Sequence, residues 1–455
     1  MAMVSCIYML CRPMAANSQK SYISLPQLID SADHFLPSLM AKKALVNSAT
    51  ANITDTRHQF LPAFRFSDQV NLGTDNSMAG SYFPFGLIPS TSAGIRAAND
   101  FQTASGNLAV LYGEYNLIDF GYKNARIDQA NSNAALKTAD YQRESYLLHA
   151  QLCRDYFNLL SSLMKLEVER QTVLRYDTIF LMIRALTLSG LRPGSDSSLA
   201  KAELSKSRIT YNQIHEHALN FREELSYLTG ISADWIIPDS SILSGTETRK
   251  TVSISAGIES NPLTNYYIYL RNAYLASERL ISKSYLPRIL LTGATWARGS
   301  SIVYDDQYKA VGSGFGYQRY NWLAGISFQY DLFNGIHRKD KLRSFGFERE
   351  SIQLELQQEE LALFSATRQA QHSIDMAERN LVEMPIQNQA ARDTYNQKLA
   401  QYKAGLIALI DLTNAAFVLD RSEIDYVETI GGWYLAQLEK AIANGTLDGF
   451  IQSIH

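Results

Sequence analysis

The 455-residue chain carries 42 Lys and Arg against 45 Asp and Glu, a net charge of -3. It therefore lacks the basic excess that is typical of nucleic-acid-binding proteins. Hydrophobic residues make up 46% of the chain, yet its mean hydropathy is -0.16 and no stretch reads as a membrane-spanning helix. Three cysteines, Cys6, Cys11 and Cys153, form no metal-binding or disulfide pattern.

Residues 1–16 resemble the remnant of a secretory signal peptide. A short apolar run at 3–11 is followed by Arg12-Pro13 and by small residues at Ala15-Ala16, although a basic n-region is missing. In a second reading, Met3-Val4-Ser5-Cys6 approximates a lipoprotein box in which Cys6 is acylated. Both readings predict export from the cytoplasm.

A first repeat is expected over residues 22–230. Two strand-like runs at 63–72 and 108–118 flank a long polar segment at 73–106. An apolar helical periodicity of about seventy residues follows, which at about 1.5 Å per residue predicts a helix on the order of 100 Å long. It ends at Gly190-Leu191, six residues before Asp196, and a second helical pattern follows.

Residues 231–260 are expected to link this repeat to a second one at 261–443, and 444–455 form a C-terminal tail. The second repeat has strand-like runs at 288–298 and 320–333 around the polar segment 299–319. Gly405-Leu406 then precedes Asp411 by the spacing that separates Gly190-Leu191 from Asp196. Because the whole pattern recurs, the sequence predicts one duplicated architecture and not several unrelated domains.

The runs at 63–72 and 320–333 alternate apolar and polar residues, and those at 108–118 and 288–298 do so less cleanly. Each run is long enough to cross a hydrocarbon core when tilted. Alternation alone fits a soluble β-hairpin packed on a helical domain equally well. The duplication favours a membrane barrel that continues into a helical barrel, with long loops at one end and abrupt helices at the other. The heptad-spaced helices predict coiled-coil packing.

Glycine and acidic residues recur at the two predicted helix-to-helix turns. Gly190 and Gly405 suit a backbone that reverses with a positive φ. Ser195-Asp196 and Asp411 stand where the next helix begins, so a carboxylate there can cap free N–H groups. Elsewhere the chain shows no nucleophile–base set, no zinc spacing and no nucleotide-binding loop, so we expect neither an enzyme nor a bound cofactor.

The order strand–strand–long helix–Gly-Leu turn–helix, repeated once from about residue 22 to 443, resembles the TolC family of outer-membrane efflux and secretion channels. The resemblance implies an α+β membrane protein: a homotrimer whose 12-stranded β-barrel, four strands per protomer, continues into a long α-helical coiled-coil barrel. It also implies location in the outer membrane of a Gram-negative bacterium, in contact with lipid, with the helices in the periplasm. The implied function is the exit duct of a tripartite efflux pump or type I secretion system, which binds a periplasmic adaptor protein and an inner-membrane transporter.

Several entrance residues follow from the resemblance. Tyr402 and Asp196 match family positions that hydrogen-bond between neighbouring coiled coils and hold the periplasmic entrance shut, with Ser195 beside them. Asp411 matches a position that forms a ring of carboxylates at the narrowest point of the tunnel. The adaptor is expected to dock on the tip turns, which comprise Gly190, Leu191, Gly405 and Leu406.

Two residues depart from the family pattern. Ile407 stands where some members have an arginine in the closing network, and Asn414 stands where some have a second aspartate. The resemblance therefore implies a looser lock and a less negative ring. The alternative function, a periplasmic coiled-coil adaptor or structural protein, predicts one helical hairpin in a small β domain and not two hairpins in tandem.

Overall fold

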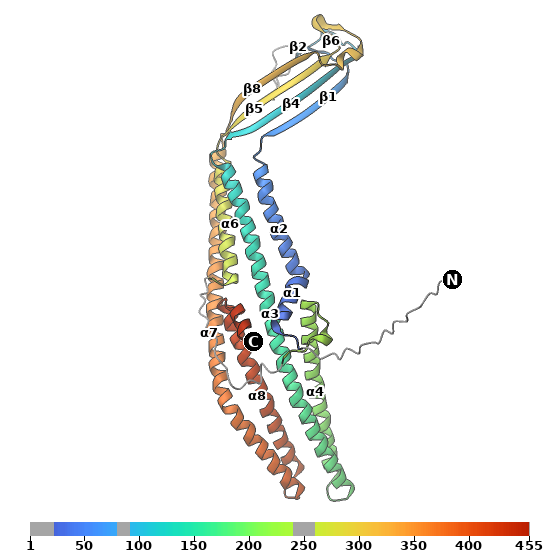
Figure 1. Cartoon of the computed structure of the whole chain (residues 1–455), viewed down its shortest axis with the longest axis vertical. Helices are drawn as coiled ribbons and strands as arrows, with labels where there is room; N and C mark the ends of the chain where they lie inside the picture. Colours follow the sequence, from blue (N-terminus) through green and yellow to red (C-terminus); the bar gives the residue numbers. More distant parts are fainter. Residues whose placement is uncertain (1–21, 80–91, 240–259, 455) are drawn as a thin grey trace, which may run out of the picture. The chain divides into compact units, whose positions relative to one another are not determined.

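The computed structural model describes residues 22–79, 92–239 and 260–454 (Figure 1). The chain divides into two compact units: a helical unit of Met1–Val46, Leu136–Leu270 and Ile352–His455, and a sheet unit of Asn47–Ala135 and Arg271–Ser351. The signal-peptide prediction for residues 1–16, including Cys6 and Cys11, lies outside the described residues.

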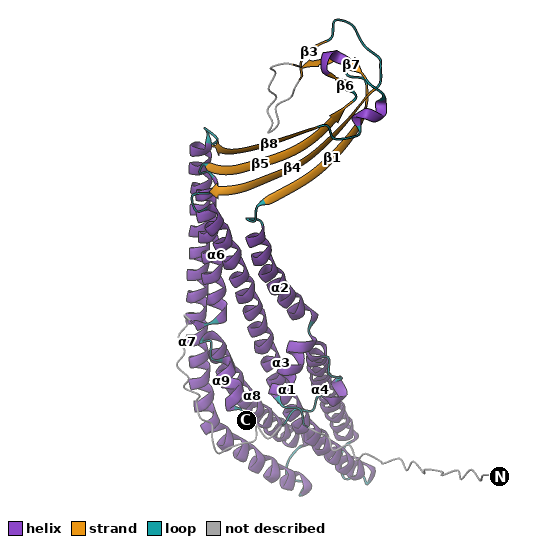
Figure 2. Cartoon of the chain, turned by 45° about the horizontal axis from the view of Figure 1, so that its top comes forward, coloured by secondary structure: helices purple, strands orange, loops and turns teal. Residues whose placement is uncertain are grey.

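The sheet unit is built on four long antiparallel strands in the order β1-β4-β5-β8 (Figures 1 and 2). Their bounds are β1 Ala63–Gly73, β4 Ala104–Ile118, β5 Arg288–Ser300 and β8 Arg319–Gln329. The pairing of β4 with β5 joins the two sequence repeats in one sheet. All four predicted strands are confirmed, but β8 ends at Gln329 and not at residue 333. The apolar alternation continues to Leu332, while the backbone is already turning into the next helix, where the Asn334 amide donates to the Asp331 carbonyl at 3.1 Å.

Each face of this sheet has its own chemistry because successive side chains alternate. Register pairs Phe64 with Gly113, Gly113 with Gly293 and Gly293 with Ala324, which places these residues on one face. That face, which we call the apolar sheet face, carries the exposed side chains Phe64, Phe66, Val70, Leu72, Trp322, Ile326 and Phe328, with Asp68 as an exception. On the edge strands β1 and β8 the opposite face carries Arg65, Ser67, Gln69, Asn71, Asn321 and Ser327, whereas the middle strands place Val110 and Trp296 on that face.

The sequence predicts that the two long connections are polar loops, but both contain short paired strands. The first contains β2 (Ser77–Ala79) paired with β3 (Ser92–Ile95), and the second contains β6 (Ile302–Val303) paired with β7 (Gln307–Tyr308). Two 3-10 turns, η3 (Tyr304–Asp306) and η4 (Val311–Gly314), complete the second connection. Gly314 packs so closely on Ser105 that a β-carbon there would clash, which explains why the chain has glycine at this position.

Two very long helices confirm the lengths predicted from the sequence: α3 (Tyr122–Leu188) has 67 residues and α7 (Asn334–Lys403) has 70. Three further helices were not separated by the sequence patterns: α1 (Leu25–Phe35), α2 (Pro37–His58) and α6 (Pro262–Ser284). Since α2 precedes β1 as α6 precedes β5, the duplication extends upstream of the strands. None of the helices in the described ranges combines the length and hydropathy of a membrane-spanning helix.

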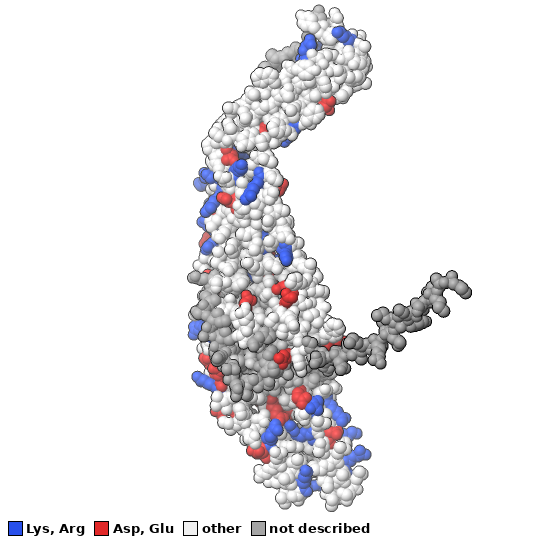
Figure 3. Space-filling model, in the orientation of Figure 1, with Lys and Arg blue, Asp and Glu red and all other residues white. Residues whose placement is uncertain are grey.

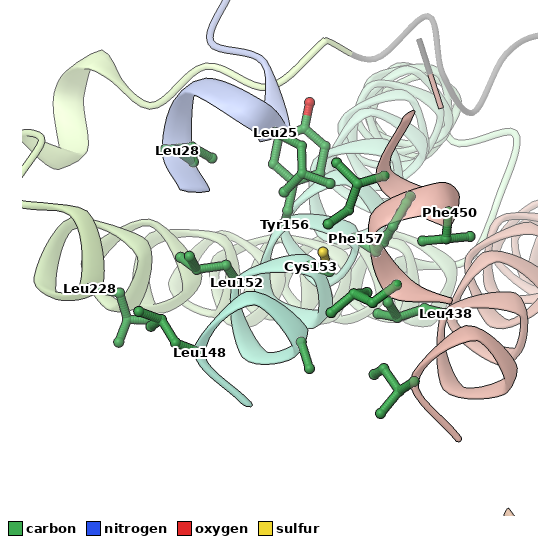
Figure 4. Close-up of a cluster of buried hydrophobic side chains, with 14 of the residues drawn as sticks. Leu25, Leu28, Leu148, Leu152, Cys153, Tyr156, Phe157, Leu228, Leu438 and Phe450 are labelled. Carbon is green, nitrogen blue, oxygen red and sulfur yellow. The ribbon is translucent and has the colours of Figure 1, made fainter. Parts of the chain in front are cut away.

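The helical unit also contains α4 (Gly194–Thr229), η1 (Ala233–Trp235), α8 (Leu409–Ala443) and α9 (Leu447–Ser453). Its main core surrounds Cys153, Tyr156 and Phe157 of α3, as Figure 4 shows, with side chains from α1, α4, α8 and α9 around them. Leu152, Tyr156 and Leu159 are fully buried, as the heptad spacing of this helix predicts. Farther along α3 the spacing does not hold, because Arg170 is exposed and Glu169 is buried in its place. The predicted C-terminal tail is ordered, since α9 buries Phe450 in this core.

The two units differ in surface charge. On the face drawn in Figure 3, few charged side chains interrupt the sheet, whereas basic and acidic side chains are interspersed over the helices near the two tip turns.

Candidate functional site

The first tip turn, between α3 and α4, is closed by two backbone hydrogen bonds. The Gly190 amide donates to the Thr187 carbonyl at 3.0 Å, and the Leu191 amide donates to the Leu186 carbonyl at 2.9 Å. This is the Schellman arrangement, which needs a left-handed residue at the position after the helix. Gly190 supplies it with a φ of 76°, and Leu191 is left 71% exposed.

The second tip turn, between α7 and α8, repeats this arrangement. The Gly405 amide donates to the Tyr402 carbonyl and the Leu406 amide to the Gln401 carbonyl, both at 3.0 Å. Gly405 has a φ of 79°, and Leu406 is 75% exposed. The equal spacing of Gly-Leu in the sequence therefore reflects one hydrogen-bonded turn that is used twice.

The helices that follow the turns begin differently. The Asp411 carboxylate accepts the Ala408 amide at 3.3 Å, which satisfies one free donor at the start of α8 and bears out its expected capping role. No side-chain cap is present at the start of α4, so that role was wrong for Asp196. Asp196 still lies in the first turn of α4, where the helix dipole favours a negative charge.

Tyr402 lies at the centre of the contact between the two helical hairpins. Its side chain is fully buried, with Ile179, Ile183, Leu204 and Leu412 in the same apolar cluster. This cluster contains residues of α3, α4, α7 and α8. Tyr402 is therefore a structural link between the first and second repeats, at the level of the tip turns.

Two charged side chains of the first tip turn approach Tyr402. The Arg192 guanidinium lies over the Tyr402 ring at 4.7 Å from its centroid, and its Nη2 donates to the Tyr402 carbonyl at 3.4 Å. Burial raises the pKa of Tyr402, the nearby Asp196 carboxylate raises it further, and Arg192 lowers it. The buried hydroxyl does not have the geometry of a full hydrogen bond with any described residue, so Asp196 is close to it without being well aligned.

The structure therefore brings together some of the residues predicted for the entrance and leaves others apart. Tyr402 and Asp196 are neighbours within one chain, and Ile407 packs against their apolar cluster. Asp411, Asn414 and Ser195 are exposed, and in the described part of the chain Asp411 is tied only to the backbone of its own helix. A ring of Asp411 carboxylates needs further copies of the chain.

Sequence reasoning missed Arg192. The resemblance led us to expect no arginine near Tyr402, because Ile407 stands at the matching position, but Arg192 of the other tip turn lies over the Tyr402 ring. Arg192 lies in the Gly190–Asp196 segment, which the sequence marks as a turn. Nothing in the sequence indicated that Arg192 would contact Tyr402, 210 residues away.

A second missed feature is an ion cluster farther along the same helices. The Glu423 carboxylate accepts Arg175 of α3 at 2.9 Å and Arg392 of α7 at 2.7 Å. Glu423 belongs to α8 and its side chain is only 12% exposed, so this cluster ties three helices together in a partly buried setting. Buried pairs of this kind favour one packing arrangement even where their net stabilisation is small.

No metal centre accompanies these clusters. Within the three described ranges, no group of three or more His, Cys, Asp or Glu side chains is arranged to hold a metal ion.

Solved structures confirm the fold. The chain is similar to the CmeC outer-membrane channel of Campylobacter jejuni, with a TM-score of 0.76 and 15% identity over 98% of this chain and 94% of that one. It is also similar to a membrane protein from Pseudomonas aeruginosa, with a TM-score of 0.74 and 18% identity over 92% of both chains. The open state of the MtrE outer-membrane channel of Neisseria gonorrhoeae gives a TM-score of 0.67 and 15% identity over 93% of this chain and 89% of that one.

No curated protein sequence matches this chain. The family model described as outer membrane efflux protein does match, over residues 28–231 and 269–439. These two segments contain β1 and β4 with the first tip turn, and β5 and β8 with the second. Both copies of the duplicated architecture, with their paired strands and Schellman turns, thus agree with one family. The chain belongs to the outer membrane efflux protein family.

Proposed function

We propose that three copies of this chain form a channel that is the exit duct of a tripartite efflux pump or a type I secretion system. In this proposal twelve strands close a barrel in the outer membrane, and the helices of the three copies form a tunnel in the periplasm. A periplasmic adaptor protein binds the tips and connects the duct to an inner-membrane transporter.

The observation that carries the proposal is the two-faced sheet with two free edges. Phe64, Phe66 and Trp322 are 73%, 72% and 79% exposed on the apolar sheet face, an arrangement that water disfavours and hydrocarbon accommodates. The long strands have 11, 15, 13 and 11 residues, enough to cross a hydrocarbon core when tilted.

The edges support closure by other copies. Strands β1 and β8 each have one unpaired edge in the described part of the sheet. Unpaired edges are not tolerated in lipid, so a four-stranded sheet requires neighbours that complete a barrel. A soluble adaptor would not need this sheet, and it would have one helical hairpin where this chain has two.

The tip supports both a gate and a docking surface. Tyr402, Arg192 and Asp196 link the two hairpins, with Ser195 next to them, and we assign the closing of the entrance to this cluster. Asp411, with Asn414 beside it, is assigned to a carboxylate ring in the trimer, where crowded negative charges attract cations. Leu191 and Leu406 are exposed at the turns, and their apolar side chains suit docking of an adaptor tip.

A photo-crosslinking experiment tests the docking step. A photoreactive amino acid is introduced at Leu191 or at Leu406, with Leu219 as the control, since Leu219 is 45% exposed on α4 away from the turns. We expect both tip positions to form crosslinks with a periplasmic adaptor, identified by mass spectrometry, and Leu219 to form none. Equal crosslinking at all three positions, or crosslinks from Leu219 alone, would contradict docking at the tips.

A further inference from the structure

A pocket of about 560 Å³ lies within the helical unit, between α3, α4 and α8, and both charged and apolar side chains line it. Four carboxylates line it: Glu169 of α3, Glu203 of α4, and Asp420 and Glu428 of α8. Aromatic side chains, among them Tyr176 and Phe417, contribute to its wall. The pocket includes no residue of the tip turns and does not include Asp411. A ligand could bind in it whether or not the protein has the proposed function.

Three of the basic side chains that line the pocket contact other groups. Lys165 donates to Glu428 at 2.8 Å, and Arg421 pairs with Asp425 at 2.9 Å. The Lys206 ammonium lies over the Phe417 ring at 5.8 Å from its centroid. Lys165 and Arg421 are thus paired with Glu428 and Asp425, and Lys206 partly offsets the charge of Asp420.

Glu169 is the most exceptional of these acids. Its side chain is 3% exposed, it lines the pocket, and it makes no hydrogen bond or ion pair with any described residue. Burying an ionised carboxylate without a partner is strongly unfavourable, so such groups are normally paired or neutral. Once it is ionised, this carboxylate offers a negative charge that a cation in the adjacent volume can balance.

Asp420 of α8 adds a second negative charge near Glu169. The Thr172 hydroxyl donates to the Asp420 carboxylate at 2.6 Å, and Asp420 has no ion-pair partner in the described part of the chain. Arg175 of α3 acts on both carboxylates and partly offsets their charge. However, its guanidinium pairs with Glu423 at 2.9 Å and lies over the Tyr395 ring at 5.5 Å, so it is shared with other partners.

We propose that this pocket binds a small organic cation, a protonated amine or polyamine, whose ammonium groups lie between Glu169, Asp420 and Glu203. The volume far exceeds that of a single metal ion, and the described residues offer no triad of metal-binding side chains. Aromatic walls next to carboxylates suit organic ammonium groups, since a ring face attracts a cation while its body excludes water.

Binding at this site is linked to protonation. Burial raises the pKa of Glu169 to about 7, the Asp420 carboxylate adds to the shift, and Arg175 opposes it. Other charged or titratable groups that line the pocket are Lys165 and Tyr176 of α3, Lys206 and His217 of α4, and Arg421 and Glu428 of α8. The cation binds the ionised form of Glu169, which with this pKa is about one-tenth populated at pH 6 and about nine-tenths at pH 8. Affinity therefore increases about tenfold between these two values.

Isothermal titration calorimetry with spermidine on the purified full-length protein tests the proposal. The measurements use an Asp411→Asn background, which removes the other expected cation site, at constant ionic strength and at pH 6 and pH 8. We expect saturable binding that is about tenfold tighter at pH 8. Glu169→Gln should weaken binding at pH 8 roughly tenfold and remove the pH difference, as expected from the loss of one charge-assisted contact. Asp420→Asn should weaken binding as well.

The matched control is Glu216→Gln, which removes an exposed carboxylate of α4 that does not line the pocket. We expect its affinity to stay within twofold of the parent. Circular dichroism and oligomer size verify that each variant is folded, and glutamine at 169 is compatible with folding because burial favours the neutral side chain. Binding that is unchanged in Glu169→Gln, equal at both pH values, or lost equally in Glu216→Gln would overturn the proposal. So would displacement of spermidine by Mg²⁺ at equal charge concentration, which would indicate a nonspecific charge effect.

Discussion

Replacing Arg192 with alanine removes a contact between the first tip turn and Tyr402 and leaves the side chains of the apolar cluster unchanged. The guanidinium lies 4.7 Å from the centre of the Tyr402 ring, and its hydrogen bond to the Tyr402 carbonyl is long, at 3.4 Å. A cation–π contact of this kind contributes about 0.5–2 kcal/mol, and a long hydrogen bond about 0.5–1 kcal/mol. Arg192→Ala should thus destabilise the closed entrance relative to the open one by about 1–3 kcal/mol. The ratio of open to closed channels then rises roughly 5- to 150-fold.

Single-channel recording in planar lipid bilayers measures this ratio. We expect Arg192→Ala to spend more time in higher-conductance states than the parent protein, and Arg192→Lys to fall between the two, because lysine keeps the charge and loses the planar stacking group. Arg184→Ala is the matched control, since Arg184 is an exposed arginine of α3 near the same tip. If Arg192→Ala remains oligomeric and gates like the parent, the proposed contribution of Arg192 to closure is refuted.

The remaining predictions concern the same helices. The double change Tyr402→Phe with Asp196→Ala should raise conductance more than either single change, because each single change removes only one polar group of the cluster to which we assign closing. Parental conductance in the double variant would argue against the lock. Asp411→Asn should keep the helix cap and lose cation preference, whereas Asp411→Ala should lose both and cost about 1 kcal/mol in stability. If cation preference survives in Asp411→Asn, the residues that select cations lie elsewhere in the channel. Because the pKa of Glu169 is raised from 4.5 to about 7 in the folded state, the native protein retains a proton that the unfolded chain loses. Stability should therefore fall by about 1–3 kcal/mol as the pH rises from 5 to 8, and thermal melting of Glu169→Gln should lack this decrease.

The parts of the fold that the sequence predicted are those set by local backbone rules. A Schellman turn requires glycine at its left-handed position, so Gly190 and Gly405 marked both tips. Period-two alternation identified the faces of β1 and β8, because side-chain direction in a strand alternates whatever its partners are. The start of α1 also follows a local rule, because Ser24 and Gln27 have the spacing of a capping box and the Ser24 amide donates to the Gln27 side chain at 3.0 Å.

The parts that could not be predicted depend on how distant helices meet. Arg192 reaches Tyr402 only after both hairpins have packed, and Thr172 meets Asp420 across 248 residues of sequence. On a single helix, Glu169 reads as one more solvated acid, because its burial comes from α4 and α8. Residue identity gives the chemistry of such sites, and helix packing determines which of these residues become neighbours.

Single-channel recording of the purified protein tests the central claim most directly. The account predicts that protein extracted from the outer-membrane fraction runs as a trimer in mild detergent and inserts into planar lipid bilayers. It should produce discrete current steps with a preference for cations that decreases in Asp411→Asn. A protein that is recovered as a monomer in the soluble fraction, or that fails to produce current steps as a folded trimer, would contradict the account.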